Sequence, residues 1–260
     1  MMEIVGDGFL ARHLRAAFGA RHPGVIAIAA GVSSTGRTPL ESLDREAELV
    51  YDVIRRGRDT GGKVVIFSTS SHALYGAADS PGTEDGPVFP VSAYGRHKLG
   101  LEAVVSREDV DWLVVRSTHL VGSGQPAHQL LPSLVAQVRS GTATVYRGHH
   151  RDLLDVRHLV LALDGLLTAG VNRRIVNVAS GTPIPIERIV AEIETRLGVT
   201  ATKRFVDGPG MRTQVSTELL RSLVPGWGDL DFGESYLREL VERYVAAETA
   251  GGAVPSLQQS

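Results

Sequence analysis

Tyr94 and Lys98 are the residues of this 260-residue chain whose types and spacing most favour catalysis. They are four positions apart, so in a helix they lie on the same face, one turn from each other. A phenol has an ordinary pKa near ~10, but an ammonium within about 4–6 Å favours the phenolate and lowers that pKa. The pair is therefore suited to pass a proton to or from a carbonyl or carbinol oxygen while another group moves a hydride.

A cluster of hydroxyl side chains at positions 68–71 precedes this pair. It follows the β-branched and aromatic run at 64–67, which predicts a buried parallel strand. The hydroxyls then lie at the carboxyl end of that strand, where open α/β sheets bind ligands. Ser92 is suited to cap the next helix, which places Tyr94 in its first turn. We expect the hydroxyls and the phenol to face one substrate.

Residues 67–76 read Phe-Ser-Thr-Ser-Ser-His-Ala-Leu-Tyr-Gly, and Tyr-x-x-x-Lys follows at 94–98. This order resembles the extended short-chain dehydrogenase/reductases, the group of sugar-nucleotide epimerases, dehydratases and ketoreductases. The resemblance implies that Tyr94, Lys98 and one serine are catalytic. The family's serine lies four residues before the aromatic of the Tyr-Gly pair, which selects Ser71. Counting forward from Phe67 selects Ser70, so both serines are candidates.

A glycine turn lies at the N-terminus, where an apolar run at 3–5 leads into Gly-Asp-Gly-Phe-Leu-Ala at 6–11. The pattern fits Gly-x-Gly-x-x-Gly/Ala between a strand and a helix, which predicts a diphosphate at the helix N-terminus. With the resemblance, it implies a bound NADP or NAD. The candidate cofactor-binding residues are Gly6, Gly8, Phe9, Leu10, Ala11, Arg12, Ala30, Gly31 and Lys98.

The second apolar run, at 25–31, departs from the usual dinucleotide fold. That fold has an Asp or Glu for the adenosine ribose about 20 residues after the fingerprint, and none stands here. The run instead resembles the family's fourth strand, so we infer that the second and third strands are missing. We expect modest cofactor affinity, and the sequence does not indicate whether NAD or NADP is bound. Arg12 and Arg37 are candidate partners of a 2′-phosphate.

Two further departures concern the chemistry. In the family, the helix after this strand often supplies an Asn that assists the Tyr/Lys pair, and the corresponding positions here read Asp-Arg-Glu at 44–46. The sequence therefore predicts a site without this assisting Asn. The dehydratases carry Asp-Glu directly after the catalytic Ser/Thr, whereas this chain has His72 and Ala73, which disfavours a dehydratase.

Three residues of the C-terminal half are candidates for substrate binding. The segment Arg-Asp-Leu-Leu-Asp-Val at 151–156 is similar to the family's segment whose Arg binds the diphosphate of a sugar nucleotide, which a guanidinium does well. A structural pair between Arg151 and Asp152 is the alternative. His119 follows the predicted strand at 111–118. It is a candidate to orient a substrate phosphate or to act as a second acid, and a packed structural histidine is the alternative. Arg212 lies where a second phosphate-binding Arg occurs.

We predict a truncated, Rossmann-like, doubly wound parallel α/β sheet with a small C-terminal substrate-binding lobe. Residues 1–118, with 151–179, form the dinucleotide-binding and catalytic domain. Residues 119–150 and 180–245 form the lobe, and 246–260 form a flexible tail rich in Gly, Ala, Ser and Gln.

Composition narrows the function further. The net charge is -2 without basic runs, so no nucleic-acid partner is expected, and the absence of cysteine excludes thiolate chemistry. No metal-ligand spacing and no apolar stretch of ~18 residues is found, which predicts no metal, no membrane partner and a cytoplasmic location. By analogy we expect a homodimer through helices at 39–57 and 92–105.

The favoured function is an NAD(P)H-dependent ketoreductase acting on a nucleotide-linked 4-keto-deoxysugar. A sugar-nucleotide 4-epimerase that retains NAD uses the same residues and stays open, as does a ketoreductase of a non-sugar natural product. From a different class, the chain is also compatible with a dinucleotide-sensing binding protein.

Overall fold

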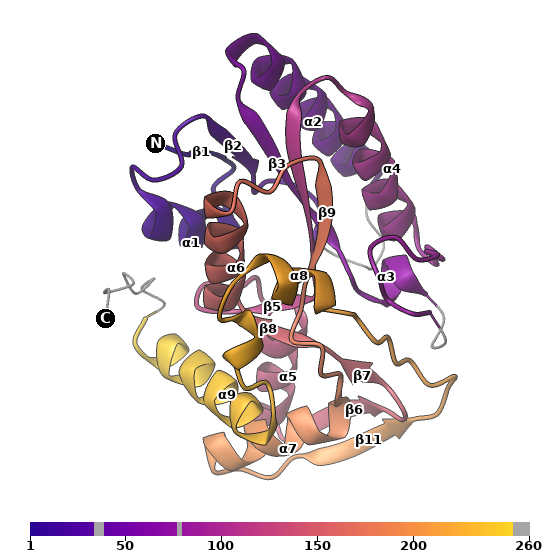
Figure 1. Ribbon diagram of the computed structural model, residues 1–260. Coiled ribbons are helices and arrows are strands. Elements are labelled where there is room, and N and C mark those ends of the chain that lie inside the picture. Colours follow the sequence, from indigo (N-terminus) through magenta and orange to yellow (C-terminus); the bar gives the residue numbers. More distant parts are fainter. Residues whose placement is uncertain (34–38, 77–79, 252–260) are drawn as a thin grey trace.

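The computed structural model describes residues 1–33, 39–76 and 80–251. Its centre is a parallel five-stranded sheet in the order β1-β2-β3-β4-β9 (Figure 1). The strands are β1 (Glu3–Val5), β2 (Val25–Ile28), β3 (Lys63–Thr69), β4 (Asp111–Ser117) and β9 (Arg174–Val178). The predicted Rossmann-like α/β fold is confirmed.

The sheet is truncated at its N-terminal edge, as predicted. β1 pairs directly with β2, with Glu3 opposite Ile26. The connection between helix α1 (Phe9–Phe18) and β2 consists of residues 19–24 and holds no strand. β1 therefore forms an edge of the sheet, on the side where a complete dinucleotide fold continues with two more strands.

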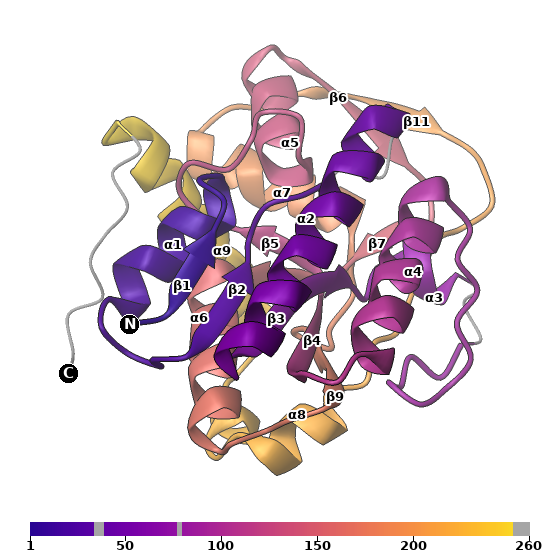
Figure 2. The same cartoon turned by 90° about the horizontal axis from the view of Figure 1, so that it is seen from above.

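Helices cover both faces of the sheet (Figures 1 and 2). α2 (Leu40–Thr60) and α4 (Ala93–Arg107) pack on one face, and α1 and α6 (Val156–Thr168) pack on the other. Neighbouring residues of β3 alternate between the two apolar layers, since Val64 and Ile66 contact the α2/α4 layer and Val65 contacts the other. A strand buried on both faces has the continuous apolar run from which β3 was predicted.

A buried ion pair attaches α4 to the sheet. Arg116 of β4 donates from Nη2 to Oε2 of Glu102 on α4 at 2.7 Å, and both side chains are almost fully buried. The hydroxyl of Ser68 at the end of β3 also donates to Glu102. Because losing one partner of a buried pair is costly, this contact holds α4 in place relative to the carboxyl ends of the strands.

Most of the remaining elements lie beyond the carboxyl ends of the sheet strands, in the lower half of Figure 1, whereas α8 (Glu218–Leu223) packs against β9 and α6. β5 (His119–Val121) pairs in parallel with β8 (Leu153–Asp155), β6 (Thr142–Tyr146) with β11 (Thr202–Val206), and β7 (His150–Arg151) antiparallel with β10 (Ile184–Pro185). The helices are α3 (His72–Tyr75), α5 (Leu130–Arg139), α7 (Ile186–Leu197), α8 (Glu218–Leu223), the 3-10 turn Trp227–Asp229 and α9 (Glu234–Thr249).

The C-terminal helix includes residues that were predicted to belong to the flexible tail. α9 ends at Thr249, so residues 246–249 of the predicted flexible tail are helical. Its last turns are stabilised because Tyr244 Oη donates to Glu248, which also pairs with Arg139 of α5 at 3.0 Å. Residues 252–260 of that tail lie outside the described residues.

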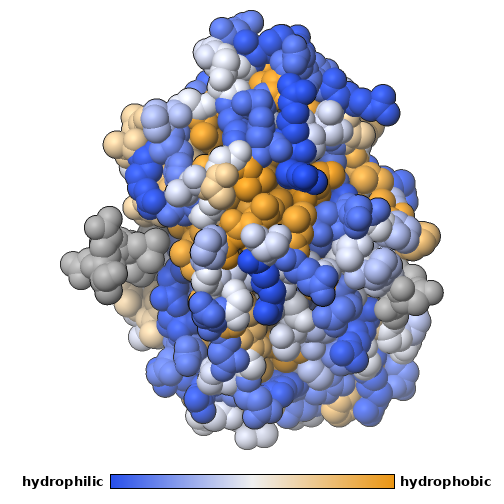
Figure 3. All heavy atoms as spheres, viewed as in Figure 1, coloured by the Kyte–Doolittle hydropathy of each residue, from blue (hydrophilic) through white to orange (hydrophobic). Residues whose placement is uncertain are grey.

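Polar and charged residues cover most of the face shown in Figure 3, and apolar residues gather near its centre. Among the helices of the described chain, none is long and apolar enough to cross a membrane.

Candidate active site

The glycine turn leads from β1 into α1. Gly6 has a φ of +113°, and a Cβ there would lie 2.8 Å from the carbonyl oxygen of Ala29. This position therefore requires glycine. Gly8 caps α1, and a Cβ on it would meet nothing within 4 Å. The first turn of α1 thus presents its backbone N–H groups and its positive end to open space, which suits a phosphate.

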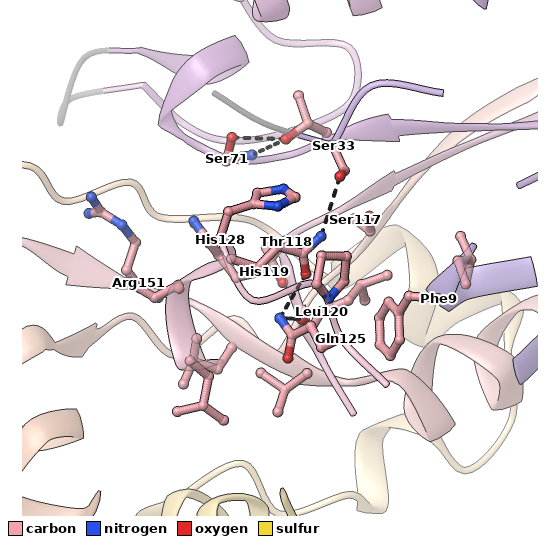
Figure 4. A pocket seen from close by; sticks show the side chains of 18 of the residues that line it. Phe9, Ser33, Ser71, Ser117, Thr118, His119, Leu120, Gln125, His128 and Arg151 are labelled. Atoms are coloured by element: carbon pink, nitrogen blue, oxygen red, sulfur yellow. Dashed lines mark hydrogen bonds between the residues drawn. The ribbon is translucent and has the colours of Figure 1, made fainter. Parts of the chain in front are cut away.

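A cavity of about 810 Å³ begins at this turn. Its volume lies within the roughly 300–1,000 Å³ of ligand sites in proteins. Figure 4 shows that it extends from Phe9 at one end to Arg151 at the other. The predicted residues that line it are Gly8, Phe9, Leu10, Ala30, Gly31, Ser71, Tyr94, Lys98, His119 and Arg151. The open helix terminus and the volume of this cavity fit a dinucleotide, whose diphosphate would be held by the N-terminus of α1.

Tyr94 and Lys98 occupy the positions predicted for them. Ser92 caps α4, since its Oγ accepts a hydrogen bond from Gly95 N–H at 3.0 Å. Tyr94 is 9% exposed and Lys98 5%. The Lys98 Nζ lies 5.7 Å from the centroid of the Tyr94 ring, and both side chains line the cavity.

The phenol differs from the expectation of an acidic tyrosine. Burial raises the pKa of Tyr94, because it disfavours the phenolate. The Lys98 ammonium lowers this pKa, while the Glu46 carboxylate raises it again. Burial outweighs the ammonium, so Tyr94 is a neutral phenol at neutral pH.

Glu46 of α2 occupies the region where an assisting Asn was missing from the prediction. It is 5% exposed, and its Oε1 accepts a hydrogen bond from Lys98 Nζ at 2.5 Å. The other carboxylate oxygen lies 3.0 Å from Nε2 of His97 and accepts from the backbone N–H of Val32 at 3.1 Å. The position is therefore filled by a buried anion rather than by an amide.

The hydroxyl cluster is divided between the cavity and the protein interior. Ser71 lines the cavity, caps α3 and accepts a hydrogen bond from the Thr69 hydroxyl at 2.8 Å. Thr69 also lies within hydrogen-bonding reach of the Tyr94 phenol and lowers its pKa. The Oγ of Ser70 is fully buried without a hydrogen-bond partner in the described chain. Of the two predicted serines, Ser71 is the one that shares the large cavity with Tyr94.

Arg151 lies at the end of the cavity opposite to Phe9, and His119 lies between these two residues (Figure 4). Arg151 and His119 also line a smaller neighbouring cavity of about 250 Å³, together with Ser70 and Ser71. Burial lowers the pKa of Arg151, and its Nη1 donates to the carbonyl of its neighbour His150. A partly desolvated guanidinium beside a cavity suits a phosphate or another anion.

Arg151 does not form the alternative structural pair with Asp152. The Asp152 carboxylate accepts instead from Thr118, from the backbone N–H and hydroxyl of Ser180, and from Gly181 N–H. It thus connects the segment after β4 to that after β9. The side chains of Arg151 and Asp152 therefore point in different directions, and the Arg151 side chain lines the cavity.

Four predicted residues do not line either cavity. Gly6 is the first residue of the glycine turn, and Ala11 is fully buried in α1. Arg12 donates to the carbonyl of Gly124 at 2.8 Å. Arg212 is exposed and lies outside both cavities, so its predicted contact with substrate is not seen; the neighbouring Met211 and Thr213 line the smaller one. Arg37 lies outside the described residues.

Sequence reasoning missed several groups of the site. The contact of Glu46 with Lys98 joins residues 52 positions apart, and Thr69 was not distinguished from its neighbouring hydroxyls. His128 and Gln125, from the segment before α5, also line the cavity (Figure 4). No local pattern marks them, because the connection reaches the cavity only through the tertiary fold. Within the part of the chain that the structure describes, no cluster of potential metal ligands is found.

Two curated proteins match part of the sequence. The dTDP-6-deoxy-L-talose 4-dehydrogenase (NAD(P)(+)) of Kitasatospora kifunensis is 31% identical over 146 residues, which are 50% of this chain and 46% of that protein. The dTDP-4-dehydro-6-deoxyglucose reductase of Escherichia coli is 24% identical over 159 residues, 57% of this chain and 50% of that protein. The chain spans about half the length of the curated relatives it matches.

Solved structures share the fold over nearly the whole chain. RMD from Pseudomonas aeruginosa complexed with NADPH has a TM-score of 0.81 at 19% identity, and the match covers 94% of this chain and 97% of that one. The UDP-glucose 4-epimerase of Thermus thermophilus in complex with NAD has a TM-score of 0.80 at 18% identity, covering 95% and 100%. At such identities the likeness establishes the fold alone.

A family model, described as the NAD dependent epimerase/dehydratase family, matches residues 9–179. This span contains α1, the hydroxyl cluster, the Tyr94/Lys98 helix and Arg151, and it covers more than half of the chain. The resemblance inferred from the sequence is confirmed: the chain belongs to the NAD-dependent epimerase/dehydratase family.

Proposed function

We propose that the protein is an NAD(P)H-dependent ketoreductase acting on a nucleotide-linked 4-keto-deoxysugar. The proposal depends on one observation, namely a single cavity lined by the N-terminus of α1, by Tyr94 and Lys98, and by Arg151. The order of these groups along the cavity supports a dinucleotide at the end formed by α1 and the diphosphate of a sugar nucleotide at the end formed by Arg151. The names of the curated relatives, a 4-dehydrogenase and a reductase of dTDP-linked deoxysugars, support the same class of substrate.

Each side chain has a role in this reaction. The reduced nicotinamide, when bound, supplies the hydride to the carbonyl carbon. Tyr94 donates its phenolic proton to the carbonyl oxygen, so that the ketone becomes a secondary alcohol. Ser71 and Thr69 orient that oxygen, and the Lys98 ammonium stabilises the phenolate that forms on Tyr94. Arg151 binds the diphosphate of the substrate.

The truncated edge of the sheet at β1 supports reduction over epimerisation, because it favours an exchangeable cofactor over one retained through a complete epimerase cycle.

The test is to mix the purified protein with NADPH or NADH and a dTDP-4-keto-6-deoxyhexose, and to follow the loss of nicotinamide absorbance and the appearance of the alcohol. We expect stoichiometric consumption of both reactants. Interconversion of two sugar nucleotides without net cofactor loss would establish the epimerase instead. Saturable cofactor binding without turnover on a panel of keto-sugars and non-sugar ketones would indicate a dinucleotide-sensing protein.

The proposal includes a homodimer through α2 and α4, as the family resemblance implies. Leu40 and Tyr51 of α2 are 67% and 47% exposed, which is compatible with a covered surface. Sedimentation should give twice the monomer mass of 27.8 kDa, and a single 27.8 kDa species at micromolar concentration would exclude the dimer.

A further inference from the structure

The carboxylate of Glu46 makes three polar contacts in the described chain, and each is with a part of the catalytic region. Its Oε1 accepts from the Lys98 ammonium at 2.5 Å. Its Oε2 lies 3.0 Å from His97 Nε2 and accepts from Val32 N–H at 3.1 Å. A buried carboxylate is stable only when paired and hydrogen-bonded, and these contacts provide both.

The backbone after β2 is shaped to admit this carboxylate. Gly31 has a φ of +142°, and a Cβ on it would lie 2.2 Å from Glu46 Oε1. Gly31 also lines the large cavity next to Ala30. Because Gly31 has no side chain, the Glu46 side chain of α2 has room to reach Lys98, which lines the cavity.

Lys98 has two acceptors that fix its ammonium group. Besides Glu46, it donates to the carbonyl of Phe67 at 3.3 Å, at the end of β3. The carbonyl is neutral, so Glu46 is the partner that opposes the charge of the lysine. An ammonium held between these two groups has little freedom to turn away from Tyr94, the residue that it assists.

We propose that Glu46 is a positioning residue of the reaction, which acts through Lys98: its carboxylate holds the ammonium beside Tyr94 and offsets part of the charge that acts on the phenol during ketone reduction. The inference rests on the proposed function and deepens it.

The charged and titratable groups that face the carboxylate all come from α4 in the described chain: His97, Lys98 and, one turn earlier, Tyr94. The segment after β2 contributes the Val32 amide, and β3 contributes no titratable group to it. Removal of the Glu46 charge therefore leaves the full charge of Lys98 acting on Tyr94, whose pKa should fall.

Glu46→Gln tests this, because the glutamine keeps the size and an acceptor oxygen but loses the charge. The tyrosinate absorbance is titrated in the wild type and in the variant, each with its Tyr94→Phe counterpart subtracted, since the chain has six tyrosines. We expect the pKa of Tyr94 to fall by about 1 in Glu46→Gln. In ketone reduction, the alkaline limb of the kcat profile should move to lower pH by a similar amount, because the acid form of Tyr94 is lost earlier.

Glu48→Gln is the matched control, since Glu48 is exposed on the same helix; neither the titration nor the limb should move. Glu46→Asp retains the charge and should restore the limb. An unchanged or raised pKa of Tyr94 in Glu46→Gln would overturn the proposal. If that variant fails to fold, Glu46→Asn provides the same comparison with the same expected direction. The titration requires no substrate, so it decides the role of Glu46 even if no keto-sugar is reduced.

Discussion

At the scale of single residues, Tyr94 is the group on which the proposed chemistry depends. Its hydroxyl is the only group that phenylalanine lacks, so Tyr94→Phe removes the proton donor and leaves the ring packing intact. We expect kcat to fall about 10²- to 10⁴-fold, the usual contribution of general acid catalysis. The affinity for NADPH, measured by fluorescence titration, should stay within about twofold. Unchanged turnover would end the assignment of Tyr94.

Arg151 is the predicted anchor of the substrate diphosphate. Arg151→Gln should raise KM for the sugar nucleotide about 10- to 100-fold with little change in kcat, because a hydrogen bond to a charged group contributes about 1.5–3 kcal/mol. Steady-state kinetics measures both values. Arg204→Gln is a control on the exposed surface of β11, and an equal effect of the two variants would show that Arg151 acts only through net charge.

His119 makes the stability depend on pH. Burial and the nearby Arg151 cation lower the pKa of His119 from 6.5 to about 4. The unfolded chain takes up this proton below pH 6.5 and the folded chain only below about 4, so stability decreases as the pH falls through that window. The loss is at most about 3 kcal/mol, since the ring is partly exposed to the cavity. Because the imidazole of His119 is neutral at pH 7, His119 is not suited to act as a second acid in the reaction.

This pH dependence is measured by urea unfolding at pH 7 and pH 4.5. His119→Asn removes the titrating ring and should show a smaller loss of stability between these pH values than the wild type does. Equal losses in both proteins would assign the acid sensitivity to other groups.

At the scale of elements, α4 is the helix whose position matters most, and two of its glycines have opposite surroundings. A Cβ on Gly95 would lie 1.8 Å from the carbonyl oxygen of Ala73 in α3, whereas one on Gly100 would meet nothing within 4 Å. The first glycine allows α3 to pack against the turn that carries Tyr94. The second one only lowers helix propensity.

We therefore expect Gly95→Ala to lower the free energy of unfolding by about 1–3 kcal/mol and to impair turnover, because α4 has to move away from α3. Gly100→Ala should raise it by about 0.5–1 kcal/mol with unchanged kinetics. Chemical unfolding of both variants checks this, and a stabilised, fully active Gly95→Ala protein would contradict the packing described for α3 and α4.

At the scale of the whole molecule, the truncated sheet determines how the cofactor is held. β1 forms the edge of the sheet, and no acid stands among the described residues that directly follow β2, at 29–33. We expect NADH and NADPH to bind with dissociation constants within about tenfold of each other, because the diphosphate and nicotinamide contacts are shared. Calorimetry measures this, and a preference above about 100-fold would reveal a ribose-binding group that the fold does not suggest.

Much of the fold was predictable because its signals are local. The apolar runs of β1, β2, β3, β4 and β9 are short and bounded by turn residues, and Ser92 caps α4 as its type and position indicate. The spacing of Tyr94 and Lys98 then follows from helix geometry. The loss of two strands beside β1 was also inferred, from the missing acid and from the resemblance of the second run to the family's fourth strand, and it agrees with the direct pairing of β1 and β2.

What only the tertiary structure decided is which distant side chains meet. Glu46 reaches Lys98 across 52 positions because Gly31 leaves room for it, and the hydroxyls of Thr69 and Ser71 face the cavity whereas Ser70 is buried. Arg212 was predicted at the substrate and lies exposed outside it. Hydrophobic periodicity and capping residues predict local backbone structure. The charges that surround Tyr94 depend instead on side chains that packing brings together from distant parts of the chain. The residue types thus indicated the family and the candidate pair Tyr94/Lys98, and the folded chain decided which charged groups surround that pair.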